Sequence, residues 1–137
     1  MAAIVHSSVL CLLLAATALA ANTPRQQVSY VATALTAREP ADAMTPFDKS
    51  FADYDKLRSY FSGLTGAFDV TNRLAVTEEQ DSEQEATITV EWALHFANAE
   101  NGFSQNRKKT VHIRLVLKKG QWKIVKFSPV ELFNPQG

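Results

Sequence analysis

The chain of 137 residues has a single cysteine, Cys11, which lies in an apolar run near the N-terminus. No second cysteine is present to close a disulfide within the chain, so an ordinary hydrophobic core must hold the fold together. The sequence also lacks a glycine-rich phosphate loop, a nucleophile elbow and a paired-carboxylate motif. No catalytic residue and no cofactor can therefore be assigned from a motif.

The first twenty residues, MAAIVHSSVLCLLLAATALA, predict a secretory signal peptide. Their apolar run extends from Val9 to Leu19, with Ala18 and Ala20 at −3 and −1 of a cut after Ala20, and a cut after Ala21 fits almost as well. At roughly a dozen residues the run is too short to span a ~30 Å hydrocarbon core. We expect residues 1–20 to be a signal peptide and 21–137 to be one secreted or periplasmic domain, with no stable membrane anchor after cleavage.

Lys and Arg are missing from residues 74–106, and Asp and Glu are missing from residues 101–130, although the 14 basic and 14 acidic residues balance. A dense basic run can mark a nucleic-acid site. Here no aromatic side chains are interleaved with the cations to stack on bases. We therefore expect no nucleic-acid partner, and we interpret the two segments as neighbouring strands whose opposite charges contribute roughly 0.2–1 kcal/mol per pair.

Two helical regions are predicted before the strands. Asn22 or Thr23 can cap a helix that has Pro24 at its first position and ends at Arg38-Glu39-Pro40. A second start at Thr45-Pro46 opens an aromatic stripe from Phe47 to Phe61, either as one helix or as two with Asp53 capping the second. Gly63 and Gly66 are expected to end it.

In the stretch EATITVEWALHF, residues 85–96, every second side chain is apolar, and the positions between them are polar except for Ala93. This pattern predicts a strand with one buried face. Turns at Asn101-Gly102 and Lys119-Gly120 would pair it with residues 111–117, and these with a last strand. The first turn places Trp92 opposite Val111 and Glu85 opposite Lys118, with an even shift allowed. The second places Leu117 opposite Trp122.

Three segments, KKGQWKIVKFSPVELF, LRSYFSGLTGAFDV and TITVEWALHF, resemble the nuclear transport factor 2-like superfamily, and the resemblance covers residues 24–135. It implies an α+β cone of the cystatin-like type, with N-terminal helices packed in the concave face of a curved antiparallel sheet of about four strands. The superfamily includes ketosteroid isomerase, scytalone dehydratase, SnoaL-type polyketide cyclases and many binding or dimerisation modules, so the fold alone implies no reaction.

The resemblance also implies a pocket between helices and sheet. Phe68, Val70, Asn72, Leu74 and Val76 share one phase of the predicted first strand, and Asn72 is the polar residue among them. On the last strand Lys126 would face inward unless a bulge turns Val125 and Phe127 inward. His95 and His112 fall on the outward face, so no metal site is expected. The candidate pocket-lining residues are Tyr30, Phe47, Phe51, Tyr54, Phe61, Asn72, Val90, Trp92, Ile113 and Trp122.

These observations favour a non-catalytic module that binds a small apolar ligand or a protein partner, with a homodimer through the sheet as one arrangement. The alternative is an isomerase, dehydratase or cyclase that acts on a hydrophobic substrate. That alternative requires an aspartate or histidine inside the cone.

Overall fold

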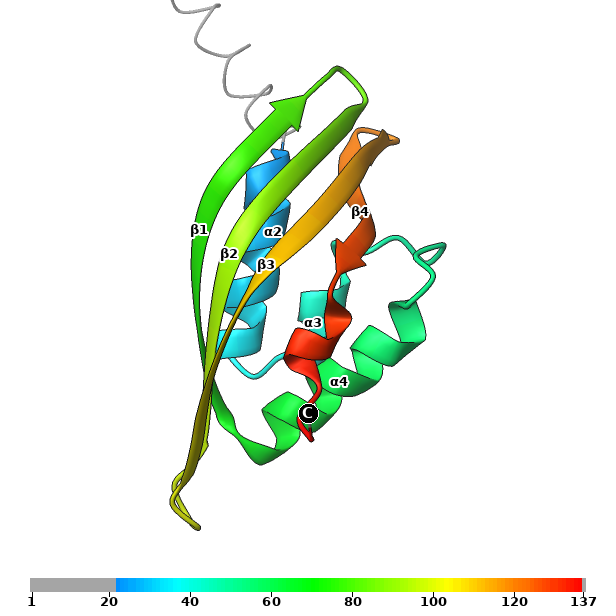
Figure 1. The fold of residues 1–137 in the computed structure, drawn as a ribbon. Helices are drawn as coiled ribbons and strands as arrows, with labels where there is room; N and C mark the ends of the chain where they lie inside the picture. The colour runs from blue at the N-terminus through cyan, green and yellow to red at the C-terminus, as the bar shows by residue number, and fades with distance from the viewer. Residues whose placement is uncertain (1–21, 137) are drawn as a thin grey trace, which may run out of the picture.

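The computed structural model describes residues 22–136, in which three helices and a short 3-10 helix lie on one face of a curved four-stranded sheet (Figure 1). The sheet is antiparallel with strand order β1-β2-β3-β4. This arrangement confirms the predicted α+β class. Within residues 22–136, every helix is too short or too polar to cross a lipid bilayer. The elements are α2 (Pro24–Thr36), α3 (Pro40–Met44), α4 (Tyr54–Ala67), β1 (Asp69–Asp81), β2 (Glu85–Asn98), β3 (Phe103–Lys118), β4 (Gln121–Ser128) and η1 (Val130–Phe133).

Helix α2 begins where the sequence predicts. The Thr23 hydroxyl accepts from the amide of Gln26 at 3.1 Å, and the Gln26 side chain accepts from the amide of Thr23 at 2.9 Å. This reciprocal capping box, with Pro24 at the first helical position, satisfies amides that have no partner within the helix.

In the second helical region, α4 begins at Tyr54 with Asp53 at its N-cap position, as the two-helix alternative predicted, although the Asp53 side chain makes no cap hydrogen bond. The predicted start at Thr45-Pro46 and the predicted stop at Gly63 are wrong. The segment after Pro46 is not helical, because it hydrogen-bonds to the edge of β4: Ile124 donates to Pro46 O at 2.8 Å, and Asp48 donates to Ile124 O at 2.9 Å. These bonds cover backbone groups that an open sheet edge would expose. At the other end, Gly63 lies inside α4, where a Cβ would come within 3.1 Å of Pro135 Cγ.

The β2–β3 hairpin has the predicted facing but a different register. Val90 rather than Trp92 lies opposite Val111, and Trp92 lies opposite Lys109. The turn spans four residues between Asn98 and Phe103, so every pair shifts by two positions and each side chain keeps its face.

The β3–β4 hairpin confirms the predicted pair of Leu117 with Trp122. Its turn residues Lys119 and Gly120 both have positive φ, 51° and 78°, as a type I′ turn requires. A register shift beside Arg114 turns Phe127 onto the concave face, where it is buried. The alternative with a bulge is therefore correct for Phe127, whereas Val125 is only half-buried, and Lys126 is exposed.

The acidic and basic segments are neighbouring strands, as predicted, although the individual partners differ. Glu85 lies opposite Val116 rather than Lys118, and it forms an ion pair with Arg114 on the diagonal. Glu91 lies opposite Thr110, whose hydroxyl donates to Glu91 Oε1 at 2.5 Å. The two-residue register shift accounts for the change of partners.

Candidate functional site

Aromatic rings fill the concave side of the sheet. Trp92 packs edge-on against Phe127 at 5.8 Å and against Phe133 at 5.3 Å between ring centroids. Phe61 meets Phe133 at 5.2 Å, and Phe47 meets Phe127 at 5.3 Å, both again edge-on. All five side chains are buried. Edge-to-face contacts at these separations are the favourable geometry of a packed aromatic core.

The predicted pocket residues divide by burial into three groups. Tyr30 lies on the molecular surface, with 43% of its area exposed. Tyr54, Asn72 and Trp122 are half-buried. The remaining six belong to the hydrophobic core: Phe47, Phe51, Phe61, Val90, Trp92 and Ile113.

Asn72 is a structural link between the sheet and α2. Its Oδ1 accepts from Trp92 Nε1 at 2.8 Å. Its Nδ2 donates to Ala32 O at 3.3 Å and to Thr36 Oγ1 at 3.1 Å. Both ends of the amide are therefore used within the fold, and the Trp92 N–H is satisfied as a buried indole requires.

Arg107, which the sequence reading missed, is a cation on the concave side near the β2–β3 turn. Its guanidinium lies 4.8 Å from the centroid of Phe96, and Nη1 donates to Leu132 O at 2.8 Å and Asn134 O at 2.6 Å. Burial lowers the pKa of Arg107. The side chain holds the C-terminal segment against the sheet.

A second feature that sequence reasoning missed is a carboxylate pair on the concave side of β1. A register shift at Thr77 places Glu79 opposite Ile88 and Asp81 opposite Ala86, two buried positions. Residues Thr77 to Asp81 include no apolar side chain. The alternation of apolar and polar residues therefore cannot show which of them face inward, and the bulge cannot be found from the sequence.

The two carboxylates have opposite pKa shifts. The hydrogen bond from Arg25 of α2 lowers the pKa of Glu79. Burial, together with the neighbouring Glu79 carboxylate, raises the pKa of Asp81. Glu79 is thus engaged in an ion pair that ties α2 to the sheet.

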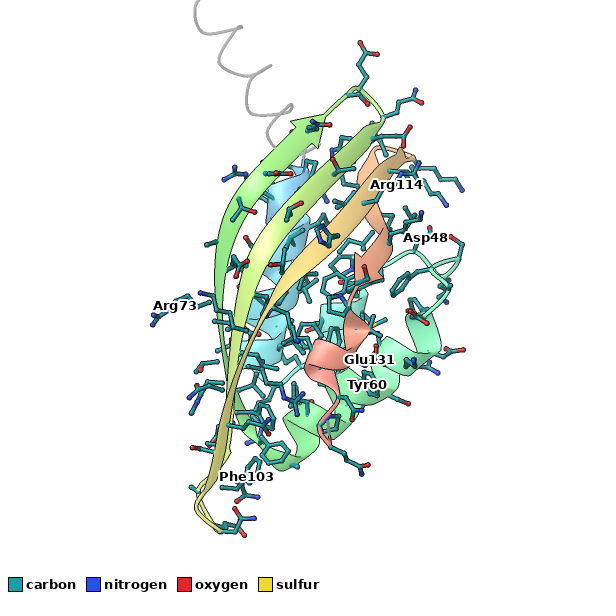
Figure 2. All side chains as sticks on the ribbon, viewed as in Figure 1. Asp48, Tyr60, Arg73, Phe103, Arg114 and Glu131 are labelled. Carbon is teal, nitrogen blue, oxygen red and sulfur yellow. The ribbon has the colours of Figure 1, made fainter. Side chains whose placement is uncertain are left out.

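The outer face of the sheet carries a hollow of about 440 Å³ across β1, β2 and β3. Arg73, Ala93 and Lys108 form one row across these strands. The short side chain of Ala93 thus lies between two cations and forms the floor of the hollow. Figure 2 shows Arg73 pointing away from the helices. Thr71, His95 and Asn106 form the next row.

The side chains that line the hollow are mostly polar or charged. Within residues 22–136, neither Arg73 nor Lys108 forms an ion pair. His95 Nδ1 lies 2.7 Å from Asn106 Oδ1, so these two side chains are linked across the hollow. Of the described residues, no three His, Cys, Asp or Glu side chains are grouped to hold a metal ion.

Comparisons with known proteins identify the fold and no more. No protein-family model and no curated protein matches the sequence. A conserved protein from Planctomyces limnophilus DSM 3776 is similar in structure with a TM-score of 0.70 at 7% identity, over 75% of this chain and 88% of that one.

Two further solved structures have names that suggest chemistry. A putative scytalone dehydratase from Novosphingobium aromaticivorans DSM 12444 matches with a TM-score of 0.64 at 15% identity, over 75% of this chain and 77% of that one. A ketosteroid isomerase-like protein from Erwinia carotovora atroseptica SCRI1043 matches with a TM-score of 0.63 at 11% identity, over 75% and 88%. The chain therefore shares the fold of these structures, an α+β cone of the kind that the resemblance implied. Identities this low carry no activity across.

Proposed function

We propose that the chain is an exported, non-catalytic interaction module that binds a protein through the outer face of its sheet. The observation that carries this proposal is the hollow over Ala93, where Arg73 and Lys108 have no ion-pair partner within residues 22–136. Unpaired charges around a small floor suit recognition of a complementary surface. A second copy of the chain is the first partner to test. Export rests on the signal sequence, which lies outside the described residues.

The packing inside the cone disfavours the other two functions. A small apolar ligand would have to displace buried rings such as Trp92 and Phe127, which are already in contact. An isomerase, dehydratase or cyclase would need a base that faces a substrate cavity. Asn72 is engaged by Trp92 and α2, and Glu79 is engaged by Arg25.

The proposal can be tested by sedimentation velocity over about a hundredfold range of protein concentration. We expect the wild-type chain to sediment as a dimer at the upper end. Ala93→Arg should be monomeric, because it places a third cation on the floor between Arg73 and Lys108. Ala41→Arg, the same change at an exposed site of α3 on the helical side, is the matched control and should dimerise like the wild type. A wild type that stays monomeric throughout would contradict self-association.

A further inference from the structure

We infer that, in the dimer, Glu91 of each copy lies over Ala93 of the other, between Arg73 and Lys108 of that second copy. This inference rests on the proposed function and adds to it the residues that set how the two copies meet. It is carried by the order of side chains in two neighbouring rows of the outer face.

The two rows are complementary in size. The first row has a long, a short and a long side chain on β1, β2 and β3, and the second row has a short, a long and a short one. On each strand, the residue in one row has a long side chain and the residue two positions away, in the other row, has a short one. The first row is Arg73, Ala93 and Lys108, and the second is Ala75, Glu91 and Thr110.

A twofold axis can bring these rows together. Let the axis run across the strands, between the two stacked sheets, at the level of Trp92. It then places each row of one copy on the other row of its partner, and the same contact forms twice, as in any isologous interface. Residues two apart on a strand are about 6.7 Å apart, and neighbouring strands are about 4.8 Å apart. Glu91 therefore arrives over the Ala93 floor with a cation on either side.

The rows on either side of these two are also complementary in side-chain size. The same axis sets Thr89 against His95 and places Thr87 over Ala97, so that no two large side chains of β2 collide. On β3 it sets Arg114 over Ser104. Stacked sheets usually cross at about 30°, so the contacts near the axis, those of Glu91 and Ala93, are the closest.

Charge selects this axis over the two simplest alternatives. An axis along β2 would stack β1 on β3 and place Arg73 over Lys108. An axis across the strands at Ala93 would place Arg73 over Arg73 of the second copy. Both oppose like charges, which costs affinity. Of these three axes, only the one at Trp92 brings a carboxylate to the two cations.

The decisive experiment uses charge reversal in two variants and their mixture. The first variant is Glu91→Lys, and the second carries Arg73→Glu together with Lys108→Glu. Each variant alone should dimerise about a hundredfold more weakly than the wild type, because like charges meet at both contacts. In an equimolar mixture a heterodimer should form with near wild-type affinity. Its two contacts are the substituted lysine between the two substituted glutamates, and Glu91 between Arg73 and Lys108.

Glu100→Lys is the matched control, since it makes the same charge change at the exposed β2–β3 turn. It should dimerise like the wild type. At a protein concentration at which the wild type is monomeric, all variants should keep the wild-type melting curve, because the substituted positions lie outside the hydrophobic core.

The outcomes separate this inference from the proposal beneath it. A monomeric wild type overturns both the inference and self-association. A dimeric wild type whose charge variants also dimerise normally overturns the placement of Glu91 and leaves self-association standing. Variants that are each monomeric but do not recover on mixing likewise overturn the placement.

Discussion

Neighbouring residues of β2 have opposite surroundings on the two faces of the sheet. The six inward side chains from Ala86 to Phe96 are each at most 1% exposed. Of the outward side chains between them, Thr87 is exposed, and Thr89, Glu91, Ala93 and His95 are half-buried. Because alternate residues of a strand point to opposite faces, one strand can carry a filled core and an open surface at once. The binding surface that we propose lies on the outer face.

The largest expected effect is on the inner face. Trp92→Ala should lower the free energy of unfolding by roughly 3–5 kcal/mol, because it leaves a cavity among Phe127, Phe133 and Asn72. Urea denaturation would measure the loss. Thr89→Ala, three residues away on the outer side of the same strand, should change stability by no more than about 0.5 kcal/mol. A loss below about 1 kcal/mol for Trp92→Ala would mean that the cone tolerates an empty interior.

A smaller loss is expected where the inner face is polar. Asn72→Ala removes the acceptor of the buried Trp92 N–H and should cost roughly 1–3 kcal/mol. The double variant Asn72→Ala/Trp92→Phe has no orphaned donor and should lose less than the sum of the two single changes. Additive losses in the same denaturation experiment would show that the hydrogen bond between them contributes nothing.

Salt should weaken association through the outer face and leave the packing of the inner face unchanged. Raising the ionic strength from 0.15 to 1 M shortens the Debye length from about 8 to about 3 Å and screens the pairing of Glu91 with Arg73 and Lys108. The dimer should weaken on the order of tenfold by sedimentation, a moderate change on the affinity scale. A dimer that strengthens with salt would indicate an apolar interface instead.

The smallest effect is expected at the carboxylate pair where β1 bulges. Because the pKa of Asp81 is raised by burial and by Glu79, the folded state binds its proton more tightly than the unfolded state. The ionised group therefore destabilises the fold at neutral pH, and this penalty disappears as the pH falls below the ordinary pKa of an aspartate. Asp81→Asn should raise stability by no more than about 0.5 kcal/mol at pH 7. Thermal melts should show no gain in acid, and equal gains at both pH values would contradict the shift.

The sequence was a good guide to which side chains face inward. The alternation from Ala86 to Phe96 and the Lys119-Gly120 turn sufficed to predict which side chains of β2 and of its partner segment in β3 face inward, and those of β4 as far as Ile124. The bulge after Ile124 left the rest of β4 open. A register shift of two residues leaves each side chain on the same face of the sheet, but it changes the residue opposite on the next strand. Trp92 was therefore placed on the correct face but opposite the wrong residue, since nothing local fixed the length of the turn after Asn98.

The features that were missed depend on contacts between distant segments. The stretch after Pro46 has helical spacing, yet its backbone bonds to β4, some eighty residues away in sequence. The pocket prediction relied on a resemblance. How completely the aromatic rings fill the space around Trp92 became clear only from their packing in the structure. The hollow over Ala93 follows from the register across three strands, so it could not be found from any one of them.

The contrast between the two faces is tested most directly by following methyl NMR signals of the purified wild-type chain through a dilution series. Ala75, Ala93 and Ala97 report the outer face, whereas Ala86, Ile88 and Leu94 report the core. The outer methyl signals should shift with concentration while the core signals stay fixed. Outer signals that keep the same positions at every concentration would contradict the claim that this face is where the protein meets a second copy.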